Sequence, residues 1–415
     1  MALTLSNFRK VWSLTLSFVF VLSAALWDIR PLGERYFDLI PIFIAIVVLI
    51  GNLSLFRQIS RFEIGLGLYV IGYCIYGYLN FQHRSSILIA LMFLLFITLR
   101  KVFPFDAFKY ALRVVFITTI AVFFAQFFVY HLSGQFYDIQ QLTDTISRTH
   151  FMHEDVDGKI TSYFRPVGLN SEPHSYCVSV ALLTLCTLRD RSMRFCHYMG
   201  AFSVLLSLSL WGLLVWPCLT CAIIATRKQK LSVFFANFSK SAVITFAGFL
   251  VLQSSVSQPF ALKHAYVDRL LNANHDVSIS ERFNKHVPNP QSIPTKNDPN
   301  RRLANSLDAE KDFNLAKAFF GAGLSTALFI EGYPINGGAF IYNSCGFLGF
   351  LIFLLLIYQH LQLRSKKRIV QKLAILSVYT SLLLSYPLIT YVFFWIFLTF
   401  VFDPRSSVIS PSGEL

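Results

Sequence analysis

The chain has 415 residues, of which 55% are hydrophobic and only 14% are charged, and its mean hydropathy is +0.56. Soluble globular domains carry roughly a quarter charged residues, so this composition excludes an ordinary water-soluble protein. A net charge of +14 would suit nucleic-acid binding in a soluble protein. Here the basic residues gather in short connections between apolar runs, as they do in cytoplasmic loops of membrane proteins. We therefore expect membrane lipid, and no nucleic acid, as a partner.

The apolar runs predict an all-α polytopic membrane protein, with residues 1–415 forming a single membrane domain. A transmembrane helix needs about 20 apolar residues. The clear candidate spans, some of them short, are 11–29, 37–56, 64–81, 86–99, 110–130, 173–188, 241–257 and 336–358. The first follows Arg9 and Lys10, and no small-residue cleavage site comes after it. We interpret it as a retained span and not as a cleaved signal peptide.

Two apolar stretches are too long for one ordinary helix and short for two. The first, 198–226, is interrupted by Trp211, Gly212 and Pro217. Because both of its flanks are basic, it must contain an even number of crossings, as two short spans or as one re-entrant hairpin. The second, 370–402, has Pro387 near its middle. Splitting it there predicts about 12 transmembrane helices with both termini in the cytoplasm.

This topology places two large polar loops, 131–172 and 258–335, on the non-cytoplasmic side. The first contains six acidic and three basic residues, which contrasts with the basic cytoplasmic connections. It also holds His150 and His153 beside Glu154 and Asp155, which we interpret as a solvated loop rather than a metal site. The cysteines lie mostly inside apolar runs without metal-binding spacing, so we expect them to pack in the core.

The sharpest local motif is the segment F-R-P-V-G-L-N-S-E-P, which runs from Phe164 to Pro173. Gly168 permits positive φ or a close backbone approach, and Pro173 suits the first turn of the next helix. Glu172 falls at the helix N-terminus, where the helix dipole favours a carboxylate. The residues alone leave two interpretations open. Either Glu172 caps the helix and Arg165 pairs with it or with lipid headgroups, or both are functional groups at membrane depth.

An R-x-x-G-L-x-x-E-P segment leading into a span, on a polytopic protein with two large outer loops, resembles the bacterial O-antigen polymerase family (Wzy-type) of the O-antigen polymerase/ligase superfamily. Residues 206–212 (L-S-L-S-L-W-G) are similar to the family's Ser-containing short span, although no Arg follows the serines here. Residues 278–283 (S-I-S-E-R-F) look like an Arg segment of its second loop. Residues 320–323, Asn336 and 346–349 resemble that loop's end and the next helix.

The resemblance implies the type C glycosyltransferase fold and an enzyme of the bacterial inner membrane. Such a polymerase joins repeat units carried on undecaprenyl diphosphate at the periplasmic face, without cofactor or metal. Its partners would be undecaprenyl-diphosphate-linked oligosaccharide, membrane lipid and a chain-length regulator.

For the diphosphate, Arg165 and Arg282 are our candidates, with Arg301 and Arg302 in reserve, because guanidinium groups match phosphate oxygens. Glu172 is a candidate general base, and His174 is an alternative that could instead be a packed helix residue. We expect substrate contacts from Gly168, Tyr333 and Asn336.

Two other functions stay open. An O-antigen ligase generally has a His near the end of its second large loop, and none lies between Gly321 and Asn343, although His264, His275 and His286 lie earlier. A lipid-linked saccharide transporter or flippase often carries charged residues within its spans. The predicted spans here are almost free of charge, because Arg113 and Lys240 lie near span ends where their side chains can snorkel.

Overall fold

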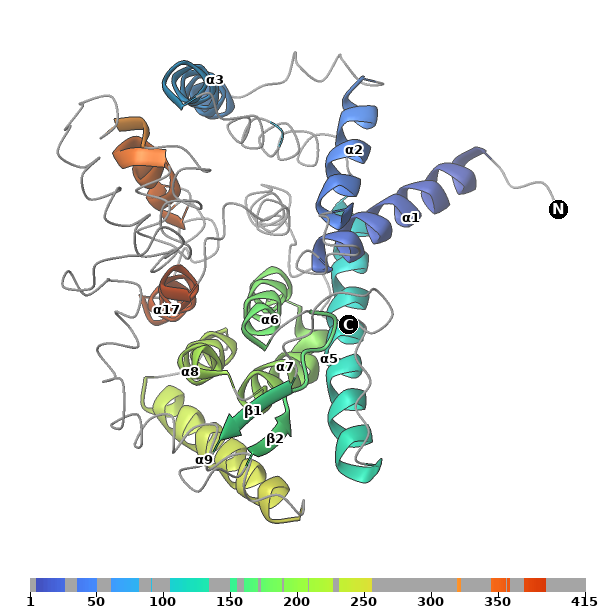
Figure 1. Cartoon of the computed structure of the whole chain (residues 1–415), viewed down its shortest axis with the longest axis vertical. Coiled ribbons are helices and arrows are strands. Elements are labelled where there is room, and N and C mark those ends of the chain that lie inside the picture. The colour runs from blue at the N-terminus through green and yellow to red at the C-terminus, as the bar shows by residue number, and fades with distance from the viewer. Residues whose placement is uncertain are drawn as a thin grey trace.

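The described part of the chain is mostly helical (Figure 1). The computed structural model describes residues 5–26, 36–50, 61–81, 91, 105–133, 150–154, 160–170, 173–188, 190–207, 209–226, 231–255, 319–321, 345–355, 357–358 and 369–385. The elements within these ranges are α1 (Leu5–Ala25), α2 (Tyr36–Ile50), α3 (Arg61–Phe81), α5 (Phe105–Ser133), β1 (His150–Glu154), β2 (Ile160–Phe164), α6 (Pro173–Thr187), the 3-10 turn η4 (Arg191–Met193), α7 (Arg194–Leu206), α8 (Leu210–Ala225), α9 (Leu231–Ser255) and α17 (Ile369–Ser385).

An antiparallel hairpin is the exception to the expected all-α architecture. Strands β1 and β2 pair within the loop 131–172, with His150 opposite Phe164 and Glu154 opposite Ile160. Both strands contain the aromatic or β-branched residues that strands favour. The sequence between them contains Asp157-Gly158, a dipeptide typical of hairpin turns. The all-helical prediction missed this hairpin because it rested on long apolar runs, and two five-residue strands in a polar loop form no such run.

Two helices cover the stretch 198–226, which fits the two short segments that its basic flanks allow, while their membrane crossings stay a prediction. Helix α7 ends at Leu206, α8 begins at Leu210, and the two pack against each other. The break falls on the serines around 207–209, and Pro217 lies inside α8 without ending it. Helix α17 ends at Ser385, two residues before Pro387, and the rest of the stretch 370–402 lies outside the described residues.

Other helix boundaries differ from the predicted spans. Helix α5 covers 105–133 instead of 110–130, and α9 begins at Leu231, ten residues before the expected start at 241. Helix α1 begins at Leu5 and so includes two basic residues of its flank. Hydropathy underestimates such helices because polar and basic residues continue a helix beyond its apolar run. Apart from Leu91, the predicted span 86–99 lies outside the described residues.

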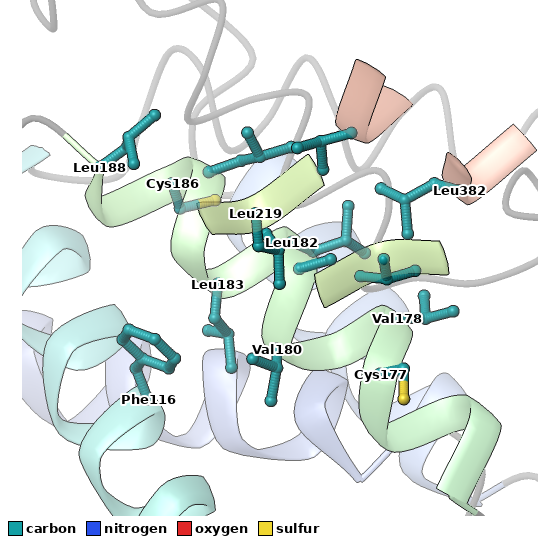
Figure 2. Close-up of a cluster of buried hydrophobic side chains, with 14 of the residues drawn as sticks. Phe116, Cys177, Val178, Val180, Leu182, Leu183, Cys186, Leu188, Leu219 and Leu382 are labelled. Atoms are coloured by element: carbon teal, nitrogen blue, oxygen red, sulfur yellow. The ribbon is translucent and has the colours of Figure 1, made fainter. Parts of the chain in front are cut away.

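Helix α6 is the centre of the core (Figure 2). It packs against α5, α7, α8 and α17, and every residue from Pro173 to Thr187 except His174 is buried. A helix that is apolar and buried all round belongs in the interior of a bundle. The predicted core packing of cysteines is confirmed for Cys177, Cys186 and Cys345, which are buried and unbonded to one another.

The outer helices carry apolar side chains on their exposed faces. On α3, Ile64, Leu68, Ile71 and Ile75 recur at helical spacing and are 50–65% exposed. Water would disfavour such contiguous apolar surface. Within the described ranges, one helix, Asp106–Tyr130, is both long and apolar enough to cross a membrane, and five apolar helices are shorter.

Candidate functional site

The motif at Arg165 forms a buried turn between β2 and α6. Arg165 directly follows β2, and the five residues from Pro166 to Asn170 are all buried. The amide of Asn170 donates to the carbonyl of Val167 at 3.0 Å, which closes the turn. We refer to residues 165–170 as the Arg165 turn. It connects the hairpin to the central helix of the core.

Gln126 on α5 binds the backbone of this turn with three hydrogen bonds. Its Oε1 accepts from the amides of Val167, at 3.1 Å, and Gly168, at 2.9 Å. Its Nε2 donates to the carbonyl of Gly168 at 3.1 Å. All three bonds are buried, where an unpaired amide would be costly. One side chain thus satisfies two consecutive amides of the turn together with a carbonyl.

Gly168 is required by its conformation and by its neighbours. Its φ is +59°, a region that residues with a side chain rarely adopt. A Cβ at this position would lie 2.7 Å from the Tyr176 ring and 3.0 Å from the carbonyl oxygen of Thr119. The predicted positive φ and close approach are therefore both confirmed. Because Gln126 occupies its amide and carbonyl, Gly168 builds the turn, and its contact with substrate stays a prediction.

Asn170 fixes the other end of the turn to two helices. Its Nδ2 lies 3.4 Å from the carbonyl oxygen of Ala25 on α1 and 3.1 Å from Ser179 Oγ on α6. Sequence reasoning missed both Asn170 and Gln126. The signal for Gln126 was present in F-F-A-Q-F-F, residues 123–128, because an amide within an apolar span needs a polar partner.

Besides Gly168, the structure describes two of the predicted site residues. Arg165 is the first residue of the turn, and His174 lies four residues after its end. Arg165 is partly buried, with its Nε inside. His174, at the start of α6, stacks on Trp211 with ring centroids 5.7 Å apart. This confirms that His174 packs against a neighbouring helix, while its role as a base stays a prediction.

The serine-rich break between α7 and α8 lies beside the same end of α6. Tyr176 and Ser203 share a 2.6 Å hydrogen bond, and Cys177 and Ser207 are 3.3 Å apart. A Cβ on Gly212 would meet the carbonyl oxygen of Val204. The two motifs singled out in the sequence, the Arg165 turn and the segment 206–212, are therefore both packed against the first turns of α6.

The opposite end of the α5–α6 pair carries charge instead. Arg113 forms an ion pair with Asp190, and Asp190 also accepts hydrogen bonds from the backbone N and Oγ of Ser192. Burial alone would raise the pKa of the Asp190 carboxyl, but the Ser192 bonds and the charges of Arg113 and Lys109 outweigh it and hold that pKa below its ordinary value. The described basic residues Lys109 and Arg113 of α5 thus lie near Asp190, at the end of the pair where the chain continues to Arg191.

Residues 319–321, which overlap the segment 320–323 singled out in the sequence, pack against α3. The ring of Phe320 stacks on Tyr69, with centroids 6.3 Å apart. Gly321 and Gly346 both have positive φ, and a Cβ on Gly346 would collide with the carbonyl of Phe319. Residues 319–321 and the start of the helix Cys345–Leu355 are therefore in close contact.

The remaining predicted site residues lie outside the described residues, namely Glu172, Arg282, Arg301, Arg302, Tyr333 and Asn336. Within the part of the chain that is described, no three His, Cys, Asp or Glu side chains gather as a metal site would require. Comparison with protein-family models finds no match, and comparison with curated proteins finds none either.

Proposed function

We propose that this protein is a surface-polysaccharide (O-antigen) polymerase that transfers glycans between undecaprenyl-diphosphate carriers in the bacterial inner membrane. The observation that carries the proposal is the Arg165 turn. An arginine stands at the edge of a buried turn whose backbone is bound by Gln126 and whose last residue, Asn170, is bonded to Ser179 on α6. A guanidinium on so fixed a backbone suits recognition of a diphosphate leaving group.

The exposed apolar faces support a membrane setting. Side chains such as Phe43, Ile50, Leu68 and Ile244 are 65–71% exposed. Scattered exposed apolar residues are ordinary in soluble proteins, but repeated rows of them on several helices suit lipid. About 12 spans, two outer loops and a type C glycosyltransferase architecture remain part of the proposal.

The reaction requires no nucleotide-activated sugar, because the donor glycan arrives already activated on its lipid diphosphate. A hydroxyl oxygen of the acceptor sugar attacks the anomeric carbon of the donor glycan, and the bond from that carbon to the diphosphate oxygen breaks. The hydroxyl proton passes to a base, for which Glu172 and His174 are the candidates. Arg165, together with Arg282, neutralises the charge that develops on the departing diphosphate.

The test is a gel of lipid-linked and surface saccharides from cells that carry Arg165→Ala. We expect single repeat units and loss of the ladder of long chains, with the protein still inserted at its normal level. Arg113→Ala, at the opposite end of α5, is the matched control and should leave the ladder intact. A normal ladder with Arg165→Ala removes this arginine from the mechanism.

A deletion strain separates the proposal from its alternatives. A polymerase predicts single lipid-linked units on the outer leaflet. Long polymer left on its carrier would instead indicate a ligase. Lipid-linked units stranded on the cytoplasmic leaflet, detected by leaflet-specific labelling, would indicate a flippase.

A further inference from the structure

We infer that Gln126 is a positioning residue for the proposed glycosyl transfer, because it sets the backbone from which Arg165 projects. This inference rests on the proposed function. Gln126 itself is bonded to the turn, and its amide has no need to touch substrate. Its effect reaches the reaction through the two peptide units that separate Val167 from Arg165.

The hydrogen bonds require a side chain that accepts and donates at its end, as the glutamine amide does. Oε1 uses two acceptor sites on consecutive amides while Nε2 donates to the carbonyl of Gly168. Glutamate would keep the acceptor but replace the donor with a charge facing a carbonyl oxygen. Leucine would fill similar space and leave two buried amides without this acceptor, which is costly in a low-dielectric interior.

Gln126 lies before the C-terminal end of α5, so the turn bonded to it lies at the same level. Gln126 is 13 residues after Arg113, which corresponds to about 20 Å of helix. From Gln126 the helix continues to Ser133, a further distance of about 10 Å. The Arg165 turn therefore lies about two turns of helix before the end of α5. Arg165 is partly buried, and a partly buried charge interacts more strongly with a diphosphate than one in bulk water.

Rotation of the turn would move Arg165. Pro166 has a fixed φ, and Gly168 is bonded to Gln126 and packed against the Tyr176 ring and the main-chain carbonyl of Thr119. Without the Gln126 bonds, the peptide units at 167 and 168 can rotate, and the arginine shifts with them. Since a misplacement of about 1 Å can cost about 100-fold in rate, we expect the loss to appear in kcat.

The experiment compares Gln126→Leu with Thr119→Val in full-length protein purified in lipid nanodiscs. Thr119 is also buried on α5, and its hydroxyl donates to the carbonyl of Val115, within the same helix, at 2.8 Å. Valine keeps the main-chain carbonyl that faces Gly168, so Thr119→Val changes only a side chain that makes no described bond to the turn. The readouts are amide hydrogen exchange across residues 165–170 and turnover of undecaprenyl-diphosphate-linked repeat units isolated from a deletion strain.

With Gln126→Leu, we expect exchange at least about 10-fold faster in the turn, kcat lower by about 100-fold, and KM within about 3-fold. Thr119→Val should change neither readout. If Gln126→Leu does not insert, Gln126→Glu, which keeps the acceptor, should give an intermediate loss of kcat. Unchanged exchange, unchanged kcat, or equal losses in Thr119→Val would each overturn the inference.

The two hypotheses fail in distinguishable ways. If wild-type protein shows no turnover, the proposed function fails and the positioning role fails with it. If Arg165→Ala abolishes turnover while Gln126→Leu opens the turn and keeps normal kcat, the positioning role alone is wrong.

Discussion

The two ends of the α5–α6 pair are joined in different ways. At one end, Arg113 and Asp190 form an ion pair, with side chains 32% and 9% exposed. At the other, Gln126 binds a turn whose residues 166–170 are buried, and Asn170 of that turn is bonded to Ser179. Partly exposed ion pairs contribute little stability because water and salt screen them. Water does not compete for buried hydrogen bonds in the same way, so we expect the second end to hold its backbone geometry more firmly.

Gly168→Ala should have the largest effect. Its positive φ and the nearby Tyr176 ring leave no room for a side chain at this position in the buried turn. We expect destabilisation of about 2–5 kcal/mol from backbone strain and overpacking, together with loss of the polysaccharide ladder. Thermal unfolding in detergent measures the destabilisation. Gly65→Ala is the control, because a Cβ there meets nothing within 4 Å. Equal behaviour of the two variants would refute the packing described for Gly168.

Asn170→Leu should cost less, about 1–3 kcal/mol, by leaving the Ser179 hydroxyl and the Ala25 carbonyl without this donor. Ser179→Ala removes one of these partners and should cost a smaller amount. Unfolding in the same detergent series ranks the two. A larger loss in Ser179→Ala than in Asn170→Leu would contradict the anchoring role of Asn170.

Asp190→Asn should have the smallest effect, at most about 1 kcal/mol at neutral pH. Asparagine keeps the capacity to accept from the Ser192 amide, so the change isolates the ion pair with Arg113. Because the pKa of Asp190 is lowered on folding, its stabilisation is present above the ordinary pKa of 3.8 and disappears as the pH falls through the lower folded value.

The difference in unfolding temperature between wild type and Asp190→Asn should therefore shrink below about pH 4. Arg191→Ala, an exposed neighbour, should show no such pH-dependent difference. A difference that stays constant from pH 7 to below pH 4 would show that the charge of Asp190 has no part in it.

Much of the helical order followed from apolar runs and basic connections. The flanks of 198–226 predicted an even number of crossings, for which two helices are present, and Pro173 and Gly168 predicted a helix start and a left-handed turn. The expected interruption at Trp211, Gly212 and Pro217 was wrong, because all three lie inside α8 and the break lies between Leu206 and Leu210. Gly212 packs closely against the Val204 carbonyl across that break, a contact between helices that the sequence does not reveal.

The partners in the candidate site could not be predicted from the sequence. Gln126 and Gly168 are 42 residues apart, and Asn170 and Ala25 are 145 apart. No periodicity connects such positions, because their contact depends on how α1, α5 and α6 pack. A lone amide in an apolar run signals that a partner exists without identifying it.

In the proposed membrane setting, the short helices around α6 would have a consequence for the surrounding lipid. Helices α7 and α8 contain 13 and 16 residues, or about 20 and 24 Å of helix, whereas the hydrocarbon core of a bilayer is about 30 Å thick. Hydrophobic mismatch of this kind is relieved by local thinning of the membrane. If α7 and α8 cross the bilayer as proposed, we expect it to be thinner beside them, so that a lipid headgroup reaches the level of the Arg165 turn while its tail stays in the leaflet.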